Sequence, residues 1–439
     1  MVEKKFKETE VGMIPEDWEV VSLGSIGEPK MCKRIMKHQT LTMGDVPFYK
    51  IGTFGGKADA FISRELFEHY KSLYSYPNVG DVLISAAGTI GRLVIYKGDD
   101  EYFQDSNIVW IDNNENKVLN KFLYYALRDT NWDTSQGTIP RLYNNSLRAK
   151  TIKIPRALPE QQRIAEALSD VDALVTTLGK LIEKKKNIKL ATMQQLLTGK
   201  HRLKGFGLDE RTGSRPTDER RKECHSERST KCEVEESSGY KMTEIGIIPE
   251  DWDCVPFHVR CYFCNESIDV SSFKAENYVG TDNMLSDKLG VTPFVGQLPY
   301  QRVKQYRKGD ILISNIRPYL KKCWLADKDG GCSADVLVVR GDKNLYDERY
   351  LFFALCNDKF FYDINAQAKG TKMPRGDKKV ISEYHILFPP TKAEQTAIAN
   401  ILTDMDNEIA QLQTRKKKYE SIKQGMMQQL LTGKIRLVD

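Results

Sequence analysis

The chain has 439 residues, of which 40% are hydrophobic and 10% aromatic, and this composition excludes an intrinsically disordered protein. Its length exceeds one ordinary hydrophobic core and predicts two to four domains. The 66 Lys and Arg residues against 60 Asp and Glu leave a net charge of +6, which permits a nucleic-acid partner without requiring one.

Targeting and cysteine patterns narrow the class of protein further. No apolar run reaches the roughly 18 residues of a membrane span, and the first residues, MVEKKFKETE, lack the apolar core of a signal peptide. We therefore expect a cytoplasmic protein whose nine cysteines are reduced thiols. Cys261 and Cys264 form a C-x-x-C pair, but no second pair completes a four-ligand zinc set, so no metal site is expected.

Residues 1–158 predict a first domain of the α+β class. Strand-like apolar runs occur at DVLIS, RLVIY and NIVWI, and FLYYAL has the pattern of one short helix. Its loops are rich in polar and basic residues. Seven of these side chains are candidates for contacting DNA: Lys33, Arg34, Lys57, Arg92, Thr138, Arg141 and Asn144.

Residues 159–200 predict a long helix. Apolar residues recur in alternating steps of three and four, which is the seam of a coiled coil. Pro159 suits the first helical turn and Gly199 supplies a stop. A helix of this length cannot bury its apolar stripe alone. The seam residues are Ile164, Leu168, Val171, Val175 and Leu178.

Residues 201–240 are charged, rich in Ser and nearly free of apolar residues, so they predict a polar linker. Residues 241–390 then return to the composition of the first domain, with strand-like runs at ILIS and VLVV and a helix pattern at YLFFAL. They predict a second α+β domain. Its candidate DNA-binding residues are Asn315, Arg317, Tyr319, Thr371, Lys372 and Arg375.

Residues 391–434 predict a second long helix. Thr391 and Glu394 have the spacing of a capping box at its start, and Gly433 supplies the stop. The same alternation of three and four marks a second seam. Its residues are Ile398, Leu402, Met405, Ile409 and Leu412.

The whole chain is an internal repeat. Residues 154–203 align without a gap with residues 388–437, an offset of 234 residues, and MQQLLTGK occurs in both. Between the matching segments the offset shifts by several residues, so a shared frame carries loops of different length. This pattern favours two modules that read different targets; neutral loop drift in a duplicated fold is the alternative. Antiparallel pairing of the two long helices would bury both seams.

A search for catalytic motifs finds none that is complete. The only Pro-Pro, in FPPT, lacks the flanks of an adenine-methyltransferase loop, and GTFGGKA departs from a phosphate-binding loop. Glu183 and Lys185 form an E-x-K on the solvated side of a helix. We therefore predict a chain without an active site. Arg and Asn side chains read guanine and adenine edges and Lys neutralises phosphates, so the basic loops predict DNA binding.

The motifs together resemble those of the specificity subunits of type I restriction–modification enzymes. The resemblance rests on G-x-I-P-x-D-W near the start of each module, on GD-(V/I)-L-I-S, on GT-x-x-P-R, and on IPRALPEQQRIAEAL and FPPTKAEQTAIANIL, each running into QQLLTGK. It implies two target-recognition domains, each reading one half of a bipartite site on double-stranded DNA, separated by an antiparallel coiled coil.

The resemblance also implies partners. Two modification subunits would dock on the helices and bring S-adenosylmethionine for adenine methylation, and restriction subunits would add ATP- and Mg²⁺-dependent translocation and cleavage, leaving this chain without a cofactor. The main alternative is a coiled-coil interaction scaffold without DNA specificity, which would lack steep salt-dependent DNA binding. An autonomous methyltransferase or nuclease is disfavoured by the missing motifs.

Overall fold

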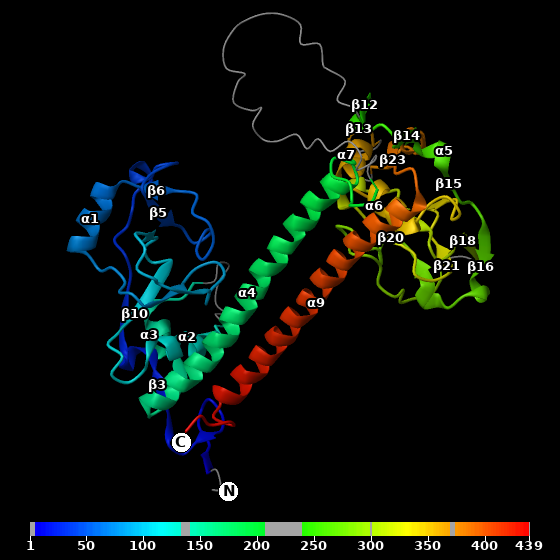
Figure 1. Ribbon diagram of the computed structural model, residues 1–439. Coiled ribbons are helices and arrows are strands. Elements are labelled where there is room, and N and C mark those ends of the chain that lie inside the picture. The colour runs from blue at the N-terminus through cyan, green and yellow to red at the C-terminus, as the bar shows by residue number, and fades with distance from the viewer. Residues whose placement is uncertain (1–4, 133–140, 207–238, 299–300, 369–373, 439) are drawn as a thin grey trace, which may run out of the picture. The chain divides into compact units, whose positions relative to one another are not determined.

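The computed structural model describes residues 5–132, 141–206, 239–298, 301–368 and 374–438 (Figure 1). Thr138, Thr371, Lys372 and most of the expected linker lie outside the described residues. The chain separates into two compact units. Unit 1 comprises Met1–Lys180 and Leu412–Asp439, and unit 2 comprises Leu181–Gln411. The predicted domain boundaries keep each long helix as one segment, whereas the boundaries between the two compact units fall inside both long helices.

Unit 1 is organised around an antiparallel sheet of four strands. Its order is β4-β10-β7-β8, with bounds Gly27–Lys30, Ile108–Asn113, Val82–Ser85 and Leu93–Ile95. All four residues of β7 are buried, so both faces of this strand are covered and its sequence reads as one apolar run. The predicted strands DVLIS, RLVIY and NIVWI are thereby confirmed as β7, β8 and β10.

The other strands of unit 1 form smaller sheets. Two-stranded sheets join β1 to β2 and β3 to β11, and a three-stranded sheet has the order β6-β5-β9. The bounds of these strands are Phe6–Lys7, Ile14–Pro15, Trp18–Ser22, Val46–Tyr49, Phe61–Ile62, Tyr102–Phe103 and Thr151–Pro155 for β1, β2, β3, β5, β6, β9 and β11. The helices are α1 (Arg64–Leu73), α2 (Asn120–Arg128), α3 (Asn144–Ala149) and the first part of α4 (Leu158–Leu196).

Unit 2 repeats this plan. Its central antiparallel sheet has the order β15-β22-β19-β20, with bounds Cys261–Phe263, Val336–Gly341, Ile311–Ser314 and Cys323–Leu325. The pairs β12–β13 (Tyr240–Thr243, Gly246–Pro249) and β14–β23 (Asp253–Pro256, His385–Phe388) correspond to β1–β2 and β3–β11. A further sheet has the order β16-β18-β21-β17, with bounds Ser267–Asp269, Arg302–Tyr306, Gly330–Cys332 and Tyr278–Val279.

The helices of unit 2 are α5 (Phe257–Arg260), α6 (Glu348–Leu355), α7 (Asp358–Ala366), α8 (Lys378–Ser382) and the first part of α9 (Lys392–Leu430). The predicted FLYYAL and YLFFAL helices are confirmed as α2 and α6. The expectation of a single short helix in each module is wrong. In unit 1, α1 was missed although the Ser63 side chain accepts the Leu66 N–H as an N-cap.

In each unit the start of one long helix and the end of the other join one core. In unit 1, Ile164 and Leu168 of α4 share a hydrophobic cluster with Leu430 near the end of α9. The start of α4 lies beside the end of α9 in Figure 1. In unit 2, Ile398 and Leu402 of α9 share a cluster with Leu196 of α4. None of the ten predicted seam residues is exposed. The two helices pack together within each unit.

Charged pairs between the helices repeat at equivalent positions. Lys423 binds Asp172 in unit 1, and Lys189 binds Asp406 in unit 2. Each residue of one pair lies 234 positions from its counterpart in the other, which is the offset of the repeat. Among the helices that the structure describes, none is both long and apolar enough to span a bilayer.

Candidate nucleic-acid interface

In unit 1 two loops predicted to contact DNA are held together by backbone contacts. The loop AAGTIG follows β7, and Arg141 lies in the segment that leads into α3. The Leu142 N–H donates to the Ala86 carbonyl over 2.8 Å, and Ala87 and Arg141 form a β-bridge. The geometry therefore fixes the Arg141 backbone against the end of a central strand.

The side chains of Arg141 and Arg34 both reach the turn before β10. Arg141 Nη2 donates to Ser106 Oγ over 2.8 Å, and Arg34 Nε donates to Asp105 Oδ2 over 2.7 Å. Ser106 is neutral, so the Arg141 charge is not neutralised by this contact. Two predicted residues, far apart in the sequence, are thus brought to one turn.

The remaining predictions in unit 1 lie in different surroundings. Lys33 Nζ stands 4.8 Å from the centre of the Tyr74 ring, while Lys57 and Asn144 are exposed. Arg92 Nη1 donates to the Phe54 carbonyl over 2.9 Å. Arg92 therefore holds the loop that contains Lys57, which is a structural use of its guanidinium.

Unit 2 brings the equivalent loops together in the same way. The Gly376 N–H donates to the Asn315 carbonyl over 2.9 Å, and Ile316 and Arg375 form a β-bridge. The Arg317 N–H adds a bond of 2.8 Å to the Pro374 carbonyl. The arginines of the two GT-x-x-P-R motifs thus have matching positions beside the central sheet.

The side chains at this junction differ from those in unit 1. Arg375 Nη2 lies 3.0 Å from Asp335 Oδ1, in the turn before β22, so this arginine is paired with a carboxylate. Arg317 and Tyr319 are exposed. Asn315 Oδ1 is buried and accepts no hydrogen bond from the residues that the structure describes. Unit 2 therefore presents a different set of polar groups on the same frame.

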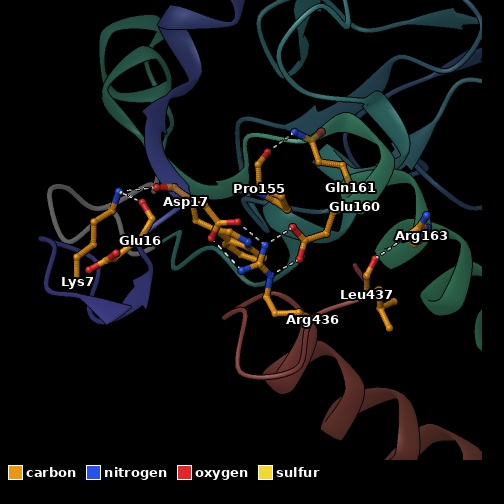
Figure 2. Close-up of polar contacts among 10 residues, drawn as sticks. Lys7, Glu16, Asp17, Pro155, Glu160, Gln161, Arg163, Arg436 and Leu437 are labelled. Carbon is orange, nitrogen blue, oxygen red and sulfur yellow. Dashed lines mark hydrogen bonds and ion pairs between the residues drawn. The ribbon is translucent and has the colours of Figure 1, made fainter. Parts of the chain in front are cut away.

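A second repeated feature, the arginine bridge, lies where each long helix ends, and it was not predicted. In unit 1 it consists of Arg436, Asp17 and Glu160 (Figure 2). Arg436 Nη1 donates to Asp17 Oδ1 over 2.8 Å, and Nη2 donates to Glu160 Oε2 over 2.8 Å. The guanidinium lies 5.9 Å from the Trp18 ring centre. The bridge joins the segment after α9 to the first domain.

The arginine bridge of unit 2 consists of Arg202, Asp251 and Glu394. Arg202 Nε and Nη2 donate to the two carboxylate oxygens of Glu394 over 2.7 and 2.8 Å, and Nη1 donates to Asp251 Oδ1 over 2.8 Å. The Glu394 carboxylate binds Arg202, so only one of the two hydrogen bonds of the expected capping box forms. The Glu394 N–H does donate to Thr391 Oγ1 over 3.3 Å.

The ionisation of the bridge follows from burial and pairing. In unit 1 the hydrogen bond from Arg436 holds the pKa of Asp17 below its ordinary value. In unit 2 burial raises the pKa of Glu394, although the bonds from Arg202 act in the opposite direction. A sequence signal for the bridge did exist, because Asp17, Glu160 and Arg202 all recur 234 residues later as Asp251, Glu394 and Arg436.

The C-x-x-C cysteines occupy separate parts of the unit 2 core. Cys261 packs in the cluster that contains Trp252, and Cys264 packs in the cluster that contains Tyr306. Burial raises the pKa of Cys261 to about 12, so this thiol stays protonated at neutral pH. Cys261 and Cys264 thus serve as core side chains in two different clusters.

Comparison with known proteins agrees with this architecture. Residues 15–190 and 275–423 match the family model of the type I restriction modification DNA specificity domain. The chain is 27% identical to a type I restriction enzyme specificity subunit of Methanocaldococcus jannaschii, over 99% of this chain and 97% of that protein.

Two further proteins are similar to this chain, one over part of its length and one over nearly all of it. A provisionally named type I restriction enzyme specificity subunit of Haemophilus influenzae is 55% identical over 38% of this chain and 43% of that protein. The crystal structure of the S subunit of a type I restriction–modification system from M. genitalium has the same fold, with a TM-score of 0.56 at 15% identity over 97% of this chain and 98% of that one. The chain therefore belongs to the family of type I restriction–modification DNA specificity subunits.

Proposed function

We propose that each unit of this chain reads one half of a bipartite site on double-stranded DNA, and that α4 and α9 set the spacing between the half-sites. The repeated loop junction is the observation that carries the proposal. Arg141 and Arg375 are held at equivalent places by equivalent backbone contacts, while the side chains around them differ. A constant frame with changed polar groups is what two readers of different sequences require.

The long helices are proposed as the docking surface for two modification subunits. Ile188 on α4 and Ile422 on α9 are 41% and 40% exposed, although both are large apolar residues. They are separated by the repeat offset of 234 residues, so each helix presents the same apolar position. A single exposed apolar residue is common on protein surfaces. Its recurrence at the same position of both repeats is the feature that supports a partner present in two copies.

The chain itself is proposed to be non-catalytic. Its bound partners would supply the chemistry: S-adenosylmethionine in the modification subunits, and ATP with Mg²⁺ in restriction subunits. The polar groups at the loop junctions suit this division, because they are arginines, asparagine and exposed aromatic side chains, which contact phosphates and base edges. A cytoplasmic location fits access to DNA and to these partners.

The first experiment co-expresses the chain with its modification subunit and measures DNA binding at increasing salt. A DNA-specificity role predicts steep loss of affinity with salt, because bound phosphates release counterions. Sequencing of methylated adenines in the same cells should give one motif of two half-sites with a fixed spacer. Salt-insensitive binding and no motif would instead support a protein-interaction scaffold.

The second experiment separates the two readers. Arg141→Ala is expected to relax the sequence preference of one half-site, and Arg375→Ala that of the other, each by about 1–2 kcal/mol. The methylated motif measures both. If either variant weakened binding equally on all sequences, that arginine would contact phosphate only.

A further inference from the structure

We propose that Arg317 reads a guanine in the half-site bound by unit 2, from a loop position that glycine occupies in unit 1. The inference rests on the proposed function and deepens it. It comes from a comparison of the loops that follow β7 and β19, where an equivalent position with positive φ is occupied by glycine in one loop and by arginine in the other.

Arg317 has a left-handed backbone that an arginine rarely adopts. Its φ is 51° and its ψ is 60°. The residue at the equivalent place in unit 1, three positions after Ser85 as Arg317 is after Ser314, is Gly88 with φ 64°. Glycine adopts this region without steric cost, whereas a side chain with a Cβ does not. The loop therefore tolerates an arginine where glycine would be more stable.

Lys321, a second residue with positive φ in this loop, has a structural explanation that Arg317 lacks. It lies two positions before β20, as Gly91 lies two positions before β8, and both have positive φ, 50° and 80°. Lys321 Nζ lies 3.1 Å from Asp358 Oδ1, so its side chain forms an ion pair inside unit 2. That contact accounts for a lysine at this position.

Arg317 has no comparable intramolecular contact. Its side chain is exposed and forms no hydrogen bond or ion pair with any residue that the structure describes. Its backbone, in contrast, is fixed by the bond to Pro374 and by the Leu320 N–H, which donates to the Arg317 carbonyl over 2.9 Å. The Arg317 guanidinium is therefore available to bind an acceptor outside the chain, and its fixed backbone lowers the entropic cost of that binding.

The neighbouring arginine is already engaged. Arg375 is paired with Asp335 in unit 2, whereas Arg141 in unit 1 contacts neutral Ser106. At the two β-bridged loop junctions, Arg141 in unit 1 and Arg317 in unit 2 therefore each have a guanidinium without a carboxylate partner among the described residues. An arginine fork pairs with O6 and N7 of guanine in the major groove, the commonest specific contact between proteins and DNA bases.

The test compares the methylated-adenine motif of the wild-type complex with that of Arg317→Gly. Glycine restores the residue type of the other repeat, and relief of the left-handed strain offsets the greater freedom of the unfolded chain. The melting temperature of the complex should stay within a few degrees of wild type. We expect one guanine of a single half-site to become degenerate, with roughly 5- to 150-fold lost discrimination, and the other half-site to stay unchanged.

Arg317→Lys and Lys321→Gly complete the design. Arg317→Lys keeps the charge without the planar fork and should also relax the guanine preference; Lys321→Gly should leave the motif intact. An unchanged motif in Arg317→Gly overturns the inference, as does equal weakening on all sequences with a shallower salt dependence, which marks a phosphate contact. If the wild-type complex itself gives no bipartite motif, the proposed function fails first, and the two failures are distinguished.

Discussion

The ends of the long helices are nearly alike in the two repeats, whereas the loops after β7 and β19 differ in sequence. MQQLLTGK is identical at both helix ends, and the arginine bridges use the same three residue types in both units. The loops begin with matching backbone contacts, yet AAGTIG in unit 1 is replaced by the longer NIRPYLK in unit 2. The two regions have been subject to different physical constraints.

The helix ends are constrained because several partners must fit one another. Gly199 lies against Pro249, Arg202 binds two carboxylates, and Leu196 joins a core. A single change there therefore produces a clash, an unpaired buried carboxylate or a cavity. The loops are held by a few backbone hydrogen bonds and by positions with positive φ, which restrict most of their side chains less than a packed core does. Their side chains are therefore free to change without loss of the fold.

The largest expected effect is on the arginine bridge. Arg202→Ala should destabilise unit 2 by about 3–5 kcal/mol, because the Glu394 side chain is 1% exposed and would lose both hydrogen bonds. Arg436→Ala should cost slightly less in unit 1. Glu160, at 2% exposed, is buried like Glu394, but the Asp17 carboxylate is 63% exposed against 26% for Asp251 and can be solvated. Hydrogen exchange by mass spectrometry would locate the faster opening in the corresponding unit.

Lys200 provides the matched control for this experiment. It lies two residues before Arg202, and its exposed side chain forms no ion pair within the described parts of the chain. Lys200→Ala should change the free energy of unfolding by less than about 0.5 kcal/mol. Equal effects of Arg202→Ala and Lys200→Ala would contradict the structural role of the bridge.

The architecture was predictable from the sequence, whereas the bridge was not. Apolar periodicity and glycine stops located α4 and α9, because these depend on neighbours three or four residues away. Arg436 binds Asp17 across 419 positions. The offset of 234 marks Arg436 as repeated, but it does not say whether its carboxylates come from its own repeat or from the other. Only the packed core decides that pairing.

The sequence indicated which loop residues are of a DNA-binding type, but it did not indicate what each side chain contacts. Basic residue types in repeated loops identified Arg92, Arg317 and Arg375 as candidates. The sequence could not show that Arg92 holds the Phe54 carbonyl, that Arg375 is paired with Asp335, or that the Arg317 backbone is left-handed. These distinctions depend on tertiary contacts and on φ, which residue type does not determine.

The glycine stops should show the next largest effect. Gly199 has φ 67°, and a Cβ there would come within 2.5 Å of the Pro249 ring; Gly433 meets Pro15 in the same way. Gly199→Ala and Gly433→Ala should each cost about 2 kcal/mol, from left-handed strain and overlap. Gly425, inside α9, has open space where an alanine Cβ would lie, so Gly425→Ala should stabilise by about 0.5–1 kcal/mol. Thermal unfolding would test the sign, and destabilisation by all three would contradict it.

The smallest expected effect concerns the N-caps of α2 and α6. Leu119 gives α2 no side-chain cap, whereas Asp347 of unit 2 accepts the N–H groups of Arg349 and Tyr350. Burial acts to raise the pKa of Asp347, but hydrogen bonds from Arg349 and Thr396 outweigh it and hold that pKa below the ordinary 3.8. A carboxylate with a lowered folded pKa stabilises the fold above its unfolded pKa, and this stabilisation is lost as pH falls through the folded value.

Below about pH 3.8, unit 2 should therefore lose the contribution of the Asp347 cap to its free energy of unfolding, and α2 of unit 1 has no such cap to lose. Asp347→Asn keeps a capping side chain but removes the charge. It should cost about 1 kcal/mol at pH 7 and make the fall in stability between pH 5 and pH 3 shallower by about the same amount. Denaturant unfolding of wild type and variant at both pH values measures this difference. Parallel losses in the two proteins would show that the Asp347 charge does not contribute, and that unit 2 relies on the cap geometry alone.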